Sequence, residues 1–248
     1  MHSTPRSAGT RQEKKPTPRN KKLANVAIIG AVMLLVVGLG ATFVRAEQAQ
    51  ARSVAAAENY VAPTYTPPTD DRPVAAFLGD SFTAGTGAGS QSKRWTTLVA
   101  ASQGWRELNY GSGGTNYGTD GPTSTAQSYA ERLTSLTMSA PDIVIVSSAG
   151  NSMNQEQQEG ITTTFESLRE KLPDAQILAT SPYTRSGVFP EHLEEFGEQI
   201  EEAVESVNGR YLDIDHPLGD RPGVMSDDGV HPNAEGYQLI ADAVEAAL

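Results

Sequence analysis

The chain has 248 residues, of which 38% are hydrophobic, and its formal net charge is −11. This length allows one domain with extensions or two small domains, and the hydrophobic content is sufficient for a globular core, which excludes wholesale disorder. The absence of cysteine excludes disulfides, thiolate zinc sites and cysteine nucleophiles. The acidic balance argues against nucleic acid as a partner, because neutralising phosphates requires clustered Lys and Arg.

The charge is distributed unevenly along the chain. Residues 1–22 carry seven basic residues and one acid, a formal charge of +6, and we expect them to form a basic cytoplasmic tail. Residues 72–248 carry ten basic and 25 acidic residues, a formal charge of −15. Between these blocks, residues 23–44 form an uncharged stretch of 22 residues. Because about 20 helical residues span the apolar core of a bilayer, we predict a transmembrane signal-anchor helix over 23–44.

Two other interpretations apply to residues 23–44. A buried core helix fits poorly, because a helix of a soluble domain shows a polar face and this stretch has none. A cleaved signal peptide has a shorter apolar region of about 7–15 residues, although small residues at Ala46 and Ala49 offer a cleavage site. We favour the uncleaved anchor, which predicts a single-pass cell-membrane protein with an extracytoplasmic domain. If the signal is cleaved, the same domain is expected to be secreted.

Residues 45–72 are rich in Ala, Pro and Thr and show no apolar periodicity. Pro63, Pro67 and Pro68 favour extended backbone of the polyproline type. This segment cannot bury a core of its own, so we predict a linker that separates the membrane helix from a domain at residues 73–248.

From residue 73 onward, short apolar runs alternate with amphipathic stretches. We predict strands at 74–78, 107–110, 142–147, 175–180 and 211–215. We predict helices at 95–102, 126–138, 156–172, 191–207 and 233–247. Strands separated by helices indicate right-handed βαβ units and a parallel sheet that is covered on both faces. The expected fold is therefore α/β, a flavodoxin-like three-layer sandwich with a central parallel sheet of about five strands.

Reactive groups collect at the carboxyl ends of the strands in such sheets, and polar residues follow three of the predicted strands. The first strand is followed by Gly79-Asp80-Ser81, which predicts a serine on a tight turn between strand and helix or, alternatively, a helix cap. The second is followed by a glycine-rich loop at 111–114, whose backbone N–H groups can approach a ligand unless the loop is merely a surface loop. The third is followed by Asn151, which is either an amide donor in the cleft or a turn residue.

A fourth polar group precedes the last predicted helix. Asp228 lies three residues before His231. A carboxylate in that position can accept the imidazole hydrogen bond, fix the tautomer and leave the other ring nitrogen free to take a proton. The alternative is a surface histidine beside a helix cap, for which Asn233 is a suitable residue.

In this order, the four blocks resemble those of the SGNH hydrolases, also called the GDSL family of esterases and lipases. The most specific matches are Gly-Asp-Ser after the first strand and Asp-Gly-Val-His-Pro before the last helix, and the resemblance covers residues 74–248. It implies that Ser81 is the nucleophile, His231 the general base and Asp228 the carboxylate that orients the base.

The resemblance also implies an oxyanion hole made of the backbone N–H groups of Ser81 and Gly114 and the side-chain amide of Asn151. Gly114 lies five residues after Asn109, where the family pattern places the glycine, and the remaining alternatives are Gly111 and Gly113. The third block departs from the family's Gly-x-Asn-Asp, because its leading glycine and trailing aspartate are both replaced. This departure affects the expected loop shape and substrate class more than the chemistry.

The implied activity is that of a membrane-tethered serine esterase or deacylase, a monomeric domain that needs no metal or organic cofactor. Its substrate is expected to be an acetylated cell-envelope glycan or a lipid ester, with acyl group and alcohol left open. One alternative is a catalytically silent module of the same fold that binds glycan or lipid. Another is a metalloesterase. A metal cluster of His216, Asp213 and Asp215 with His231 is disfavoured relative to a structural turn, because no metal-ligand spacing such as His-x-x-x-His is present.

Overall fold

The computed structural model describes residues 70–118, 127–149, 151, 155–183 and 191–248. The predicted basic tail at 1–22 and the predicted membrane helix at 23–44 lie outside the described residues, as does nearly all of the predicted linker at 45–72. Within the described ranges, no helix combines the length and apolar character that crossing a membrane requires.

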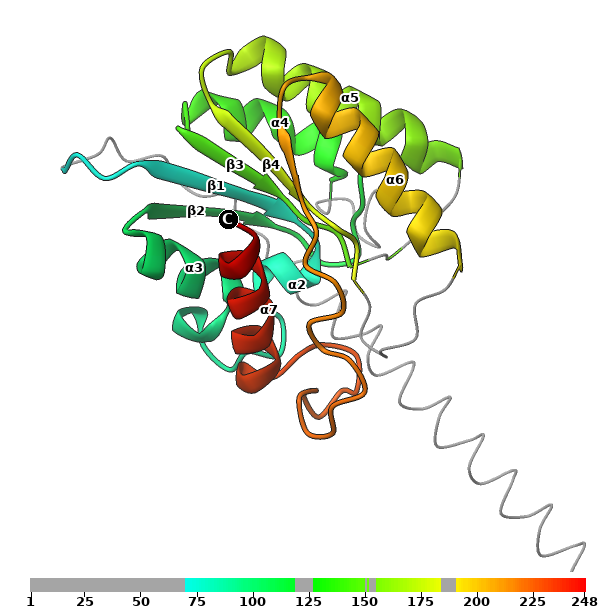
Figure 1. Cartoon of the computed structure of the whole chain (residues 1–248). Helices are drawn as coiled ribbons and strands as arrows, with labels where there is room; N and C mark the ends of the chain where they lie inside the picture. The colour runs from blue at the N-terminus through cyan, green and yellow to red at the C-terminus, as the bar shows by residue number, and fades with distance from the viewer. Residues whose placement is uncertain (1–69, 119–126, 150, 152–154, 184–190) are drawn as a thin grey trace, which may run out of the picture. The chain divides into compact units, whose positions relative to one another are not determined.

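Five parallel strands of the described chain form one sheet in the order β2-β1-β3-β4-β5 (Figure 1). The strands are β1 (Val74–Gly79), β2 (Arg106–Gly111), β3 (Ile143–Val146), β4 (Gln176–Thr180) and β5 (Arg210–Leu212). This order is that of flavodoxin-like folds, in which the chain reverses its direction of winding between β1 and β3. The α/β fold class and the five-stranded parallel sheet predicted from the sequence are confirmed.

Helices cover both faces of the sheet (Figure 1). One face packs against α4 (Tyr129–Met138), α5 (Gln155–Lys171) and α6 (Glu191–Ser206), and the other packs against α3 (Trp95–Gln103) and α7 (Ala234–Ala247). Alternate residues of β1 enter the two cores, with Leu78 in one and Phe77 in the other. The central strands are therefore buried on both sides, as expected for a parallel sheet.

Two predicted elements differ from the structure by three residues at one end. Helix α4, predicted at 126–138, begins at Tyr129 instead of residue 126, because the Ser128 hydroxyl accepts from the Glu131 N–H and caps the helix. The fifth strand ends at Leu212 instead of residue 215, and Asp215 has a left-handed φ of 51° that is incompatible with an extended strand.

A short helix, α2 (Ser81–Ala84), and a turn of 3-10 helix, η1 (Gln91–Lys93), follow β1 and were not predicted as separate elements. Gly111, at the end of β2, packs directly on α2. A Cβ atom at Gly111 would lie 2.1 Å from the backbone nitrogen of Ala84. The absence of a side chain at Gly111 therefore allows the loop after β2 to approach the turn that carries Ser81.

Candidate active site

Ser81 is the first residue of α2 and follows the carboxyl end of β1 directly, with only 2% of its surface exposed. The N-cap of α2 is Asp80, whose Oδ1 accepts from the Phe82 N–H at 2.9 Å. The alternative that Ser81 merely caps the helix is therefore wrong. None of the described residues accepts the backbone N–H of Ser81, which leaves that donor available to a ligand.

His231 joins Ser81 to Asp228 through its two ring nitrogens. Its Nε2 lies 2.9 Å from the Ser81 Oγ, and its Nδ1 lies 2.8 Å from the Asp228 Oδ2. The histidine is 2% exposed, so the alternative of a surface histidine is wrong. The Phe82 ring lies beside the imidazole with 5.7 Å between ring centroids, which restricts the orientations open to the histidine.

The Asp228 carboxylate is held by several donors of its own loop. Its Oδ1 accepts from the Ser226 hydroxyl at 2.9 Å and from the N–H groups of Val230 and His231 at 2.8 and 2.9 Å. Burial by itself would raise the pKa of Asp228, but the hydrogen bonds from His231, Val230 and Ser226 outweigh that effect and lower the pKa to about 2. Asp228 is therefore ionised near neutral pH.

The loop that carries Asp228 and His231 is closed on itself. The Ser226 N–H donates to the His231 carbonyl at 2.8 Å, and Met225 pairs with Pro232 in an isolated bridge. The Asn233 side chain donates to the carbonyl oxygen of Gly223 at 2.6 Å and caps α7, as predicted. We call this segment, residues 223–233, the histidine loop.

The three glycines considered for the oxyanion hole differ in their hydrogen bonds. The Gly111 N–H donates to the Asn109 Oδ1 at 2.9 Å, so it is already occupied. Among the described residues, no acceptor is found for the N–H of Gly113 or Gly114. Gly114 has a left-handed φ of 73°, which turns the chain sharply and favours glycine. These observations favour Gly113 and Gly114 over Gly111.

Asn151 is exposed, and its Nδ2 donates to the Thr115 carbonyl at 3.0 Å. The side chain thus lies beside the segment that contains Gly114, whereas its chain neighbours at 150 and 152 are outside the described residues. Two residues earlier, the Ala149 N–H donates to the Asp80 Oδ2 at 2.7 Å. The loops after β1, β2 and β3 are therefore joined by hydrogen bonds.

Sequence reasoning assigned no role to two charged residues beneath this site, Asp80 and Arg132. Asp80 is fully buried; burial raises its pKa, and the N–H groups of Ala149 and Phe82 oppose that rise. Arg132 is 1% exposed. Its position in α4, between Tyr129 and Leu136 on the buried face, is the signal in the sequence that could have identified it.

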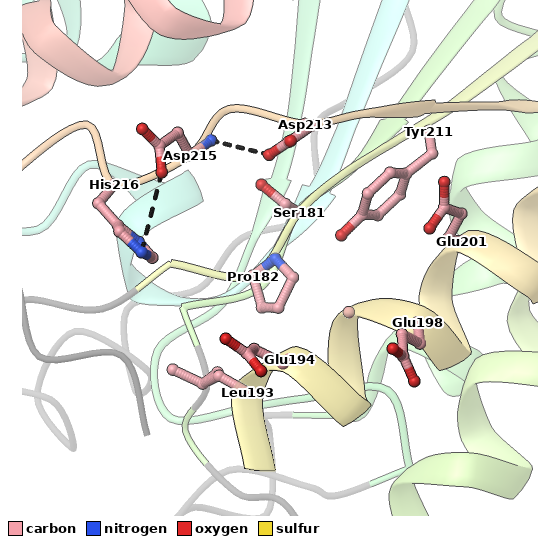
Figure 2. Close-up of a pocket in the computed structure, with 11 residues that line it drawn as sticks. Ser181, Pro182, Leu193, Glu194, Glu198, Glu201, Tyr211, Asp213, Asp215 and His216 are labelled. Carbon is pink, nitrogen blue, oxygen red and sulfur yellow. Dashed lines mark hydrogen bonds and ion pairs between the residues drawn. The ribbon is translucent and has the colours of Figure 1, made fainter. Parts of the chain in front are cut away.

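A hollow of about 250 Å³ lies between α6 and the ends of β4 and β5, away from Ser81 and His231 (Figure 2). His216 lines it together with Tyr211 and several carboxylates. The His216 Nε2 lies 3.8 Å from the Asp215 Oδ1, and the Asp215 N–H donates to the Asp213 Oδ1 at 3.0 Å. Within the described part of the chain, no group of three His, Asp or Glu side chains is placed to hold a metal ion.

A hydrogen-bonded Ser–His–Asp arrangement at the carboxyl edge of an α/β sheet is the constellation of serine hydrolases. Residues 77–239 match the GDSL-like Lipase/Acylhydrolase family, and the chain belongs to this family. Membership of this family supports an ester-hydrolysing enzyme.

Individual proteins are also similar to this chain. The chain is 29% identical over 184 residues to GDSL lipase Rv0518 of Mycobacterium tuberculosis, covering 68% of this chain and 78% of the relative. Two solved structures share its fold. Est24, a carbohydrate acetylesterase from Sinorhizobium meliloti, has a TM-score of 0.54 and 17% identity over 71% of this chain and 98% of that one. A family two carbohydrate esterase from Clostridium thermocellum has a TM-score of 0.60 and 14% identity over 73% and 64%.

Proposed function

We propose that this protein is a serine esterase or deacylase that hydrolyses carboxylic esters with Ser81 as nucleophile. The observation that carries the proposal is the 2.9 Å separation between the Ser81 Oγ and the His231 Nε2, with Asp228 bonded to the other ring nitrogen. A serine hydroxyl is a weak nucleophile until an adjacent base removes its proton. The three side chains have the geometry that this activation requires.

In the first half of the reaction, the Ser81 Oγ forms a bond to the ester carbonyl carbon while His231 accepts the hydroxyl proton. Asp228, already ionised, stabilises the resulting imidazolium. Negative charge develops on the carbonyl oxygen. It is met by the N–H of Ser81, the N–H of Gly114 and the second N–H of the Asn151 amide, since the first donates to Thr115.

In the second half, the tetrahedral species collapses. The bond from carbon to the leaving alcohol breaks, and His231 returns its proton to that alcohol oxygen. Water then attacks the acyl-enzyme with His231 again as base, and the acid leaves as Ser81 is regenerated. Every step uses groups of this chain and water.

We further propose that the substrate is an acetylated cell-envelope glycan or a lipid ester. Two proteins with this fold are named as carbohydrate esterases, and the mycobacterial relative is named as a lipase. Comparing initial rates on an acetylated glycan with rates on p-nitrophenyl esters of increasing acyl length distinguishes the two. A preference for acetyl esters and glycans supports the first substrate class, and a preference for long acyl chains supports the second.

The proposed location is the outer side of the cell membrane, with residues 23–44 as the anchor. The 22 uncharged residues and the basic flank of seven Lys and Arg support this orientation. Protease added to intact cells is expected to remove a tag fused to the C-terminus. A tag that survives in intact cells, and is digested after lysis, would contradict the proposal.

The activity is tested with the full-length chain purified in detergent. A fluorophosphonate probe is expected to label the protein, and peptide mapping is expected to place the label on Ser81. Ser81→Ala is expected to abolish both labelling and hydrolysis of p-nitrophenyl acetate. The matched control is Ser92→Ala, at an exposed serine of η1, which is expected to retain both. A folded wild-type protein that neither reacts nor hydrolyses esters would favour the silent binding module.

A further inference from the structure

Arg132 is a buried cation that reaches the backbone beneath the candidate active site. Its NH2 nitrogen donates to the Gly79 carbonyl at 3.0 Å and to the Thr115 hydroxyl at 2.9 Å, and its NH1 donates to the Tyr110 carbonyl. Its Nε donates to the Gln127 carbonyl at 3.0 Å. One guanidinium group thus connects the end of β1, the end of β2 and the start of α4.

These acceptors are placed around the proposed oxyanion donors. Gly79 lies two residues before Ser81, and Tyr110 and Thr115 flank the loop that contains Gly114. The Thr115 carbonyl in turn accepts from the Asn151 amide at 3.0 Å. The planar fork of Arg132 therefore fixes both ends of the glycine loop relative to the turn that carries the serine.

Stability alone is a weak reason for an arginine at this position. Removing a guanidinium from water is costly, and buried charges can often be replaced by apolar groups with no loss of stability. The geometry offers a better reason, because the guanidinium presents several donors in a rigid plane and can hold several carbonyl groups at once. A lysine carries the same charge but has no such fork.

We propose that Arg132 is a positioning residue for the oxyanion hole, holding the N–H of Gly114 and the amide of Asn151 in register with Ser81. This inference rests on the proposed esterase function. According to this proposal, Arg132 of α4 controls the rate of the chemical step, although α4 carries none of the proposed reacting atoms.

Arg132→Lys tests the proposal in the full-length chain. We expect kcat for p-nitrophenyl acetate to fall about 10²-fold while KM changes little, because misplaced oxyanion donors affect the transition state more than substrate binding. The matched control is Arg169→Lys. Arg169 also donates to several backbone carbonyls, including those of Val207, Pro173 and Ala175, but at the opposite edge of the sheet. Its replacement is expected to lower thermal stability and leave kcat unchanged.

A second variant tests the same proposal if Arg132→Lys folds poorly. Thr115→Val removes one acceptor of the guanidinium and also the hydrogen bond that this hydroxyl donates to the Ser112 carbonyl at 2.8 Å. Because the other acceptors of Arg132 remain, we expect a smaller loss of kcat with the same unchanged KM. Equal kcat values for wild type, Arg132→Lys and Thr115→Val would overturn the proposal even if Ser81→Ala is inactive.

Hydrogen exchange provides a readout that does not depend on activity. In Arg132→Lys, the hydrogen-bonded amides of residues 111–118 are expected to exchange about tenfold faster than in wild type, while those of β4 keep their protection. The hydrogen-bonded amides are those of Gly111, Ser112, Tyr117 and Gly118. Unchanged exchange at 111–118 would refute the positioning role. If wild type lacks esterase activity but Arg132→Lys still exchanges faster than wild type at 111–118, the proposed function is refuted and the role of Arg132 in ordering the loop is retained.

Discussion

The Nε2 of His231 lies 2.9 Å from the Oγ of Ser81, although 150 positions separate the two residues in the sequence. Two contacts near this pair join the segment that follows α2 to α7 and to the histidine loop. The Tyr237 hydroxyl of α7 donates to the Thr86 carbonyl at 2.8 Å. A Cβ atom at Gly87 would lie 2.6 Å from the Pro232 carbonyl, so the two segments are in close contact.

Replacing Asp228 by asparagine tests the role of the carboxylate. We expect Asp228→Asn to lower kcat by about 10³–10⁴-fold, because an amide no longer fixes the histidine tautomer or stabilises the imidazolium. The control is Asp227→Asn, at the exposed neighbouring aspartate, which is expected to keep wild-type kcat. Steady-state kinetics with p-nitrophenyl acetate measure both, and comparable rates for the two variants would contradict the assignment.

The same carboxylate predicts an acid-dependent loss of stability. The pKa of Asp228 is lowered to about 2 in the folded protein, below the ordinary aspartate value near 3.9. Its contribution to stability is therefore complete above pH 4 and is lost as the pH falls towards 2. Urea unfolding followed between pH 5 and pH 2 should show a shallower decline for Asp228→Asn than for wild type or Asp227→Asn. Parallel declines in all three proteins would show that the carboxylate is not held in this way.

Replacing Asn151 is expected to lower the catalytic rate without lowering the stability of the fold. Because the side chain is exposed and donates only to the Thr115 carbonyl among the described residues, we expect Asn151→Ala to leave the thermal midpoint nearly unchanged. Loss of one oxyanion donor lowers kcat by about 10²–10³-fold. Steady-state kinetics and thermal unfolding of the same preparation measure both effects. An unchanged kcat would show that Asn151 is not part of the oxyanion hole.

Gly111 tests the close contact between β2 and α2. In Gly111→Ala the new Cβ would lie 2.1 Å from the Ala84 nitrogen, so backbone must move. We expect a loss of stability of about 1–3 kcal/mol, the range of overpacked cores, together with reduced activity. Gly89→Ala is the control, because its Cβ would meet nothing within 4 Å and its cost comes from a φ of 79° alone. Urea unfolding should show the larger loss for Gly111→Ala.

Local patterns in the sequence predicted much of the scaffold. The apolar runs of β1, β3 and β4 indicated buried strands. In the predicted helix at 191–207, five apolar residues recur at helical spacing, and all five are buried, namely Leu193, Phe196, Ile200, Val204 and Val207. The period of a helix or strand is a local property, so it can be read without knowledge of the fold. The short motifs around Ser81 and His231 likewise indicated the candidate catalytic residues.

Contacts between distant segments could not be predicted in this way. The Asp80 carboxylate accepts from the N–H of Ala149, which is 69 positions away, and no local pattern encodes that pair. Arg132 was missed because basic residues of an amphipathic helix are normally assigned to its wet face. The left-handed backbone of Asp215, which excludes this residue from β5, is likewise a property that no periodicity reveals.

The closure of the histidine loop has a practical consequence for protein engineering. Its internal hydrogen bonds hold the base and its carboxylate together as one cassette, whose geometry is set by residues 223–233. We therefore expect this loop to keep its histidine–aspartate pair when it is transferred to another scaffold of the same fold. We do not expect the same of the turn that carries Ser81, because the neighbouring Asp80 carboxylate accepts a hydrogen bond from the loop after β3. A redesigned active site should therefore keep the serine and its surroundings and vary the loop that carries the histidine.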